Sequence, residues 1–205
     1  MKTKLLTVNA TDAGIHLSCA YPYLARFFKD LGPISMPVPP PIPVAEAIVR
    51  VVIGQMLSRV AAKTIYSRVA VARERLGLPG SWSLPSGELI GCGLSKRKER
   101  TIKAFAEVYE KDPQSIENWR FMPNNELVKT VRSFWGLSEW SANILSIFYF
   151  CDPDVFPTTD ASITRAITTV EERFLGNSLK FDPEYAKPFR SYLSLYLWKS
   201  LDAGY

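Results

Sequence analysis

The stretch that decides the fold is Phe134-Trp135-Gly136-Leu137-Ser138-Glu139-Trp140-Ser141-Ala142. It indicates a tight hairpin between two helices, because Gly136 can adopt backbone conformations that are closed to other residues and lets the chain approach a partner closely. The helix that follows begins with free amide groups, which have no partner within the helix, and such groups attract a phosphate. An ordinary turn between two helices is the alternative interpretation.

A single carboxylate, Asp160, stands downstream of this hairpin, at the end of Asp154-Val155-Phe156-Pro157-Thr158-Thr159-Asp160. We expect it at the start of the next helix, where the helix dipole favours the ionised form. One interpretation is that Asp160 only caps its helix, which is a common use of aspartate. The other is that it is a catalytic acid group, and both roles can hold at once.

Composition narrows the class of protein. The chain has 205 residues, of which 47% are apolar, and a net charge of +5 with a pI near 9.1. These values fit a folded protein with a polyanionic partner. Cys19, Cys92 and Cys151 are far apart and form no CxxC pair, so we expect neither a zinc ribbon nor an iron–sulfur cluster. An odd number of cysteines indicates a protein of a reducing compartment. The longest apolar run, 144–151, is too short to span a membrane.

The hydrophobic pattern is helical from residue 44 onward, which predicts an all-α fold. Ser58 is expected to cap the second long helix, and Asn124 or Asn125 the one before the hairpin. The proline-rich stretch 36–43 indicates an extended strap, or alternatively a proline-motif ligand. The expected helices are 23–31, 45–53, 58–76, 88–92, 95–110, 126–134, 138–150, 160–174 and 185–199.

Four blocks in order resemble the helix-hairpin-helix DNA glycosylase superfamily, in its 3-methyladenine DNA glycosylase II branch. The hairpin of that branch reads L-P-G-I-G-x-W-T-A, and its aspartate lies in a phrase like D-v-F-P-x-x-D. The separation of 20 residues between Trp140 and Asp160 also fits the spacing between hairpin tryptophan and aspartate in that branch. The stretch 47–58 looks like E-a-L-v-r-a-I-i-G-Q-Q-L-S, and 187–198 looks like P-y-R-s-x-A-x-x-y-L-W. The chain departs from the pattern at Trp135, in place of proline, and at Ser138, in place of the second glycine.

The resemblance implies one catalytic unit, 1–205, of two helical lobes. The first would comprise about 1–43 plus 176–205, and the central one about 44–175, with the hairpin at 132–142. It implies excision of a damaged base from DNA with Asp160 as the catalytic carboxylate. Another branch carries a Schiff-base lysine where this chain has Trp140, so we expect hydrolysis without lyase activity.

The resemblance also assigns roles in binding. Met56 would be the wedge that fills the gap left by a flipped base, unless it is a core residue. Independently of the resemblance, the charge cluster Lys96-Arg97-Lys98-Glu99-Arg100 would add a basic patch, unless it is only a solvated helix start. The expected base-pocket residues are Trp140, Trp135, Tyr149 and Trp198, each of which has a core alternative. The expected DNA-binding residues are Gln55, Met56, Leu57, Ser58, Gly136, Leu137, Ser138, Thr158, Thr159, Lys96 and Arg97.

We expect no required cofactor. A monovalent cation, sodium or potassium, is implied on the backbone carbonyls of Arg132, Phe134 and Leu137. The implied partner is double-stranded DNA with a damaged base, bound by a monomer in the cytoplasm beside the nucleoid, or in the nucleus of a eukaryote. The favoured substrate is an alkylated purine such as 3-methyladenine or 7-methylguanine. Alternatives are deaminated, oxidised or mismatched bases, a catalytically silent lesion-binding protein, and a helical scaffold with no nucleic-acid role.

Overall fold

The computed structural model of the protein describes residues 10–175 and 181–204. The described residues are mainly helical and contain no strand, as the all-α prediction requires. None of their helices is long and apolar enough to cross a membrane. The α-helices are α1 (Ala10–Ala20), α2 (Ala25–Leu31), α3 (Val44–Gly54), α4 (Arg59–Arg75), α5 (Ser86–Gly91), α6 (Lys96–Lys111), α7 (Pro113–Glu117), α8 (Asn124–Arg132), α9 (Glu139–Leu145), α10 (Ala161–Val170) and α11 (Arg190–Asp202).

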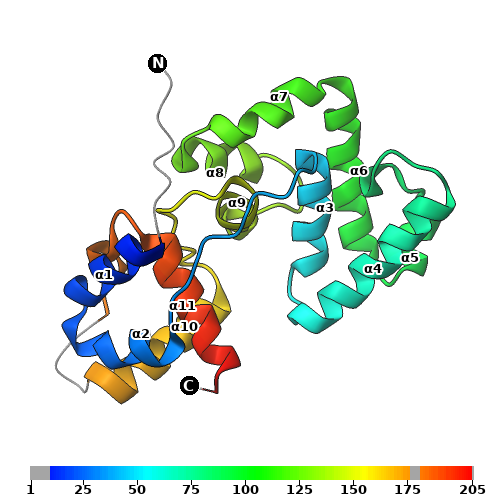
Figure 1. Ribbon diagram of the computed structural model, residues 1–205. Coiled ribbons are helices and arrows are strands. Elements are labelled where there is room, and N and C mark those ends of the chain that lie inside the picture. The colour runs from blue at the N-terminus through cyan, green and yellow to red at the C-terminus, as the bar shows by residue number, and fades with distance from the viewer. Residues whose placement is uncertain (1–9, 176–180, 205) are drawn as a thin grey trace. The chain divides into compact units, whose positions relative to one another are not determined.

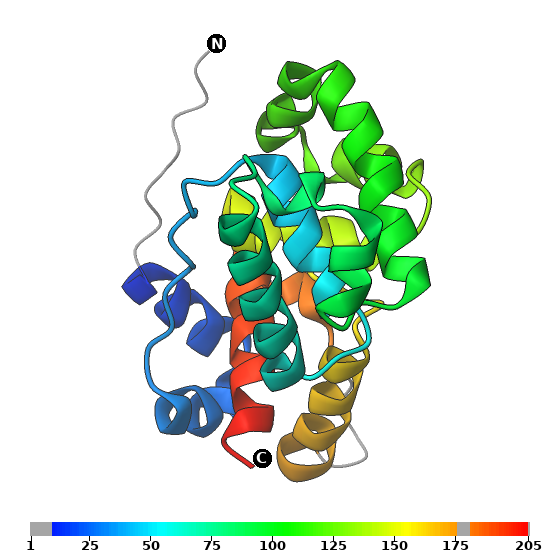
Figure 2. The same cartoon turned by 90° about the vertical axis from the view of Figure 1, so that its right-hand side faces the viewer.

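Short helical turns connect several of these helices. The 3-10 turns are η1 (Pro22–Leu24), η2 (Ser81–Ser83), η3 (Asn118–Phe121) and η7 (Pro183–Ala186). Two π-turns, η4 (Ser146–Phe150) and η5 (Glu171–Leu175), continue α9 and α10. The stretch 36–43 contains no helix and is extended, in agreement with the prolines that forbid one; it is the blue segment without coils in Figure 2.

The chain divides into two compact units. The first comprises Met1–Val38 and Cys151–Tyr205, and the second comprises Pro39–Phe150. We expected the lobes to divide near residues 43 and 176, so the structure places α10 and the segment before it with the terminal helices rather than with the hairpin. Parts of the expected first lobe, 1–9, 176–180 and 205, lie outside the described residues.

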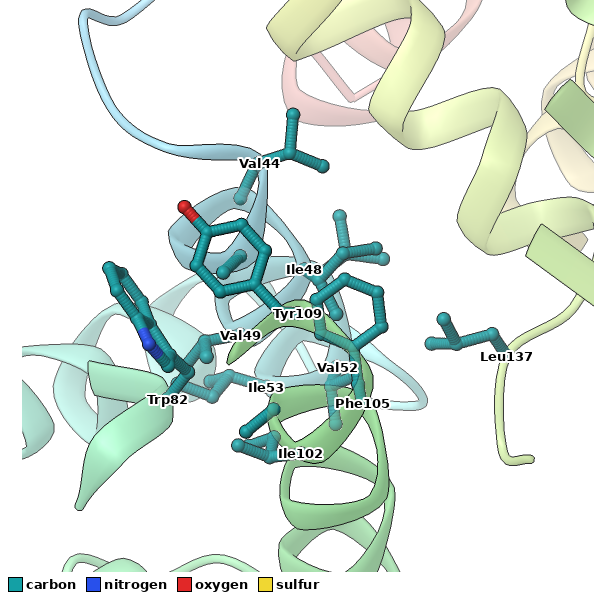
Figure 3. Close-up of a cluster of buried hydrophobic side chains, with 14 of the residues drawn as sticks. Val44, Ile48, Val49, Val52, Ile53, Trp82, Ile102, Phe105, Tyr109 and Leu137 are labelled. Carbon is teal, nitrogen blue, oxygen red and sulfur yellow. The ribbon is translucent and has the colours of Figure 1, made fainter. Parts of the chain in front are cut away.

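The second unit is built around α3, which lies between α6 and α9 (Figure 1). No proline or glycine interrupts the apolar run of α3 before Gly54, and Pro43 stands at its N-cap. Its side chains meet Ile102 and Phe105 of α6 in the main hydrophobic cluster of this unit, shown in Figure 3. Leu137 of the hairpin belongs to the same cluster, so burial of apolar surface fixes the hairpin to the core.

The first unit packs α10 against α11, with α1 and α2 completing a second hydrophobic cluster. Aromatic contacts dominate this core: the rings of Phe28 and Tyr196 are 5.0 Å apart, and those of Tyr21 and Phe181 stack at 5.5 Å. The sequence analysis did not predict α1. Its buried residues Ala13 and Leu17 are one turn apart, which is too little apolar surface to give a clear period.

Two of the expected helix caps were tested by the structure. Ser58 does cap α4, because its hydroxyl accepts a hydrogen bond from the Ala61 amide at 3.3 Å. The prediction of an asparagine cap on α8 was wrong: Pro123 holds the N-cap position. The Asn124 side chain instead accepts a hydrogen bond from Ser146 Oγ at 2.8 Å. A partner from a distant helix thus outcompetes the local cap.

Candidate functional site

The predicted hairpin joins α8 to α9, and its turn depends on Gly136. This glycine has φ +79, and a Cβ on it would lie 2.0 Å from Thr101 Oγ1. Thr101 is buried on α6, and its hydroxyl donates to the Arg97 carbonyl at 3.0 Å. The close approach that we predicted for this glycine is therefore made to α6, inside the protein, and the positive φ independently favours glycine.

Ser138, which replaces a glycine of the family pattern, is the N-cap of α9. Its Oγ accepts from the Ser141 amide at 3.4 Å, and Ser141 Oγ accepts from the Ser138 amide at 3.3 Å, so the pair forms a capping box. The Leu137 amide donates to the Phe134 carbonyl at 3.2 Å. Two amides that we expected at a phosphate, those of Leu137 and Ser138, therefore donate within the protein.

The hairpin is anchored on its other side by Phe134. The ring of this residue lies 5.4 Å from that of Phe105 and 5.4 Å from that of Trp119, both of which are buried. Arg132 ends α8, and Leu137 is buried in the main cluster. The three residues expected to offer carbonyls to a cation thus belong to one turn that is fixed by packing. Within the described residues, no group of three or more histidine, cysteine or acidic side chains forms a metal site.

The turn between α3 and α4 presents Met56 to solvent. This side chain is 100% exposed, and its backbone is in the left-handed region, with φ 55. The alternative that Met56 is a core residue is therefore wrong. Leu57 is also exposed, and Ser58 is occupied in capping α4. A long, unbranched apolar side chain that stands free of the protein surface can insert between stacked bases.

Gln55, the residue before Met56, is turned toward the hairpin. Its Nε2 donates to the Gly136 carbonyl at 3.0 Å and to Ser141 Oγ at 3.3 Å. We expected Gln55 among the DNA-binding residues, whereas the structure commits its side-chain amide to the protein. The sequence analysis did not anticipate this link, which joins two loops 81 residues apart.

The start of α6 carries the basic patch. Lys96 and Arg97 are exposed in its first turn, and Ser95 caps the helix by accepting from the Lys98 amide at 3.3 Å. Arg100, one turn further, stacks on Trp135, with its guanidinium carbon 4.3 Å from the ring centroid. Trp135 is 45% exposed and so lies on the surface of the hairpin, against a cation.

The other two expected pocket residues of this unit lie deeper than Trp135. Trp140 is half-buried against the main cluster. Tyr149 lies beside Arg50, and burial raises its pKa to about 12. Arg50 also donates to the Tyr66 hydroxyl at 2.6 Å, which in turn donates to the buried Glu46 at 3.0 Å. Sequence reasoning missed this polar group, although two charged residues four apart in an otherwise apolar helix were a signal of it.

Asp160 lies in the first unit, where it is the N-cap of α10 and only 8% exposed. Three donors converge on its Oδ1: the Ser162 amide at 2.8 Å, the Ile163 amide at 2.9 Å and Trp198 Nε1 at 3.3 Å. These hydrogen bonds fix the orientation of the carboxylate. Asp160 therefore does cap its helix, and Trp198 of α11, expected in a base pocket, contacts it.

Thr158 and Thr159 are exposed in the turn before Asp160. The Asp160 amide donates to the Pro157 carbonyl at 3.0 Å, which closes this turn. The two hydroxyls thus lie beside the carboxylate in sequence and are accessible to a partner.

An ion pair that the sequence analysis missed holds the preceding segment. Arg190, at the start of α11, donates to Asp154 through Nε at 2.8 Å and through Nη2 at 3.0 Å. The hydrogen bond to Asp154 raises the pKa of Arg190. The neighbouring Ser191 Oγ accepts from the Val155 amide at 2.9 Å and donates to the Asp152 carbonyl at 2.7 Å. The turn that carries Asp160 is therefore fastened to α11.

Comparison with known proteins points to one group. DNA-3-methyladenine glycosylase 1 of Schizosaccharomyces pombe is 28% identical over an alignment of 218 positions, which covers 95% of this chain and 89% of that protein. The alkylbase DNA glycosidase-like protein mag2 of the same yeast is 25% identical over 196 residues, which cover 90% of each. The solved structure of the S. pombe 3-methyladenine DNA glycosylase with abasic DNA matches with a TM-score of 0.74 and 25% identity, covering 93% of this chain and 96% of that one. No family model matches the chain.

Proposed function

We propose that this chain, which belongs to the helix-hairpin-helix DNA glycosylase superfamily, hydrolyses the bond between a damaged base and its deoxyribose in double-stranded DNA. The favoured substrate class is purines alkylated on a ring nitrogen, such as 3-methyladenine and 7-methylguanine. The observation that carries the proposal is the geometry of Asp160, a largely buried carboxylate oriented by two helix amides and the Trp198 indole.

The chemistry follows from the charge that develops during the reaction. As the bond from the sugar C1′ to the base nitrogen breaks, positive charge builds on the sugar. A fixed carboxylate close to that carbon stabilises this charge and can direct a water to it. The water oxygen bonds to C1′, its proton is lost, and the products are a free base and an abasic site. Asp160 supplies the fixed charge without needing to move, because its helix already holds it.

Alkylated purines suit a site of this kind. Methylation of a ring nitrogen makes the base cationic and a good leaving group, so little general-acid assistance is needed. Electron-rich rings bind such a base through cation–π attraction. Trp140, Tyr149 and Trp198 are the aromatic candidates for this contact. Trp135 is a weaker candidate, because its ring already carries Arg100.

Base excision should not be followed by strand cleavage. A glycosylase that also cuts the strand uses an amine that forms a Schiff base with C1′. At the position where the lyase branch carries its lysine this chain has Trp140, whose indole is not a nucleophile. Water is therefore the proposed nucleophile, and the abasic strand stays intact until alkali cleaves it.

Binding to the duplex is assigned to two loops of the second unit. Met56 would occupy the space left by the flipped base. The hairpin would hold a phosphate: its capping-box bonds of 3.3 and 3.4 Å are long, and a phosphate oxygen is a stronger acceptor than a serine hydroxyl. A monovalent cation on the carbonyls of Arg132, Phe134 and Leu137 would support this contact. The bond that Phe134 accepts does not prevent it, because a carbonyl oxygen has two lone pairs.

A protein with this activity works where the cell keeps its DNA, which means the nucleus, or the nucleoid region of a bacterial cytoplasm. It requires no cofactor for hydrolysis. We propose a monomer, since access of a duplex to both loops favours one.

The test is release of free bases from DNA treated with a methylating agent, analysed by chromatography. We expect 3-methyladenine or 7-methylguanine in the supernatant, strand breaks only after hot alkali, and no borohydride-trapped adduct. Salt-sensitive DNA binding with no base released would instead favour a different lesion or the silent lesion-binding protein. A panel of deaminated, oxidised and mismatched duplexes would then separate these two alternatives.

A further inference from the structure

One lysine of the basic patch does not point toward solvent. Lys98, in the first turn of α6, donates from Nζ to the Ile53 carbonyl at 2.9 Å and to the Gln55 carbonyl at 2.8 Å. Its partial burial lowers its pKa. The ammonium group thus binds the C-terminal end of α3, where the helix dipole favours a cation.

The two carbonyls that Lys98 holds belong to the residues three and one positions before Met56. The Gln55 carbonyl is the last acceptor ahead of the left-handed residue, and the Leu57 amide, just after it, donates to the Gly54 carbonyl at 3.2 Å. A left-handed conformation is strained for a residue other than glycine. The turn therefore needs external support, and these hydrogen bonds supply it on both sides of Met56.

The same residue, Gln55, connects the turn to the hairpin. Its backbone carbonyl accepts from Lys98, while its side-chain amide donates to the Gly136 carbonyl at 3.0 Å and to Ser141 Oγ at 3.3 Å. Ser141 in turn belongs to the capping box of α9. One chain of hydrogen bonds thus runs from α6 through the Met56 turn to the hairpin, all within the second unit.

We infer that Lys98 is a positioning residue for base flipping: with Gln55 it holds the Met56 turn in a fixed register with the hairpin. This inference rests on the proposed function. It implies that a duplex gripped by the hairpin meets a wedge that is already in place, so the cost of ordering the turn is not added to the cost of unstacking the base. In this role Lys98 acts on the DNA through the Met56 turn, because its ammonium group is committed to two backbone carbonyls.

The substitution that tests this is Lys98→Met, which keeps an unbranched stem and removes the donor. The chain offers a matched control on the same helix: Lys103 donates to the Leu84 carbonyl at 2.7 Å, away from both loops. Lys103→Met removes a comparable hydrogen bond and leaves the Met56 turn intact. Lys98→Arg keeps a donor at the carbonyls. If Lys98→Met fails to fold, Gln55→Leu is measured in its place, because it removes the hydrogen bonds that link the Met56 turn to the hairpin.

The measurement is the single-turnover excision rate of 7-methylguanine, in a fully paired duplex and in a bulge where the base is already unstacked. For Lys98→Met we expect a loss of about tenfold or more in the paired duplex, since a misplacement of about 1 Å can cost up to 10²-fold, and a loss of less than about threefold in the bulge. Lys103→Met should match the wild type on both, and Lys98→Arg should recover most of the rate.

A second readout does not depend on catalysis. Hydrogen exchange of the Leu57 amide, without DNA, should become faster in Lys98→Met and stay unchanged in Lys103→Met. Equal behaviour of the two variants in both assays, or equal losses on paired and bulged DNA, would overturn the inference. If the wild type releases no base, the proposed function fails, while the exchange measurement still decides whether Lys98 holds the turn.

Discussion

A single carboxylate carries the proposed chemistry, and its surroundings at the residue scale explain why it can. Asp160 accepts hydrogen bonds from two amides and an indole at its Oδ1. The same residue can therefore be a helix cap and a catalytic group. The two interpretations that the sequence left open are thus compatible. A carboxylate held by charge-assisted hydrogen bonds keeps one orientation and loses little entropy when a substrate arrives.

Trp198 is the residue whose role can be measured separately. Trp198→Phe removes the Nε1 donor to Asp160 and keeps an aromatic ring. One hydrogen bond to a charged group is worth about 1.5–3 kcal/mol, and we expect the excision rate to fall by about tenfold while the affinity for abasic DNA stays within about twofold. Single-turnover kinetics and fluorescence anisotropy measure the two quantities. A changed affinity with an unchanged rate would instead make Trp198 part of a binding surface.

At the scale of elements, the hairpin is the part whose construction the sequence predicted most directly. Phe134 and Leu137 anchor it by packing, and Gly136 allows it to approach α6. The glycine was expected to serve a close approach to a partner, and the structure shows that Thr101 is such a neighbour inside the fold. Stability and DNA binding therefore make demands on the same turn.

Gly136→Ala should therefore destabilise the protein by about 2 kcal/mol or more, from the left-handed φ and the overlap with Thr101 together. Adding Thr101→Ala should recover the part due to overlap and leave about 1 kcal/mol from the backbone. Gly87→Ala, in α5 where no atom lies within 4 Å of the added Cβ, is the control and should be neutral or slightly stabilising. Urea denaturation gives the free energy of unfolding of the wild type and of these three variants. A Gly136→Ala variant as stable as the control would show that the turn is not constrained as described.

The pairs of elements joined across long sequence separations are what the sequence did not reveal. Asp154 and Arg190 both belong to blocks that resemble the family, and they are 36 residues apart in the sequence. Neither block contains a pattern that predicts their ion pair. Lys98 was expected only as one charge in a basic run, and its burial against two carbonyls follows from where α3 ends. Local patterns predicted most of the helices and the Ser58 cap, because these depend on neighbours in sequence. Partners brought together by tertiary packing, such as the Ser146 hydroxyl that binds the Asn124 side chain, are not encoded at any fixed spacing.

At the scale of the whole molecule, the net charge of +5 is modest, so DNA affinity must depend on where the cations lie. Lys96 and Arg97 are exposed at the first turn of α6, on the helix that also supports the hairpin and the Met56 turn. Most of the helices and their order could be predicted from periodicity, whereas α1 and the short α7 could not. The boundary between units could not, because the sequence on either side of Cys151 gives no compositional shift to mark it.

This distribution of charge makes a prediction about salt. Removing one cation that binds a phosphate should reduce the slope of log affinity against log salt by about 0.9, so the Lys96→Ala, Arg97→Ala double variant should lower it by about 2. Lys111→Ala, at the other end of α6 and also exposed, should leave the slope unchanged. Titration of a labelled duplex at several salt concentrations measures it. Equal slopes for all three proteins would make the patch a solvated helix start, the alternative interpretation of the sequence.

The most direct test of the central claim is the single-turnover excision rate of Asp160→Asn on methylated duplex DNA, measured beside its affinity for abasic DNA. Asparagine keeps an oxygen that accepts from the Ser162 and Ile163 amides, so the helix cap and the affinity should be retained. Only the negative charge is removed, and the rate should fall by at least about 10²-fold. A rate within about threefold of the wild type, with affinity intact, would contradict the account, because the carboxylate would then be a helix cap and nothing more.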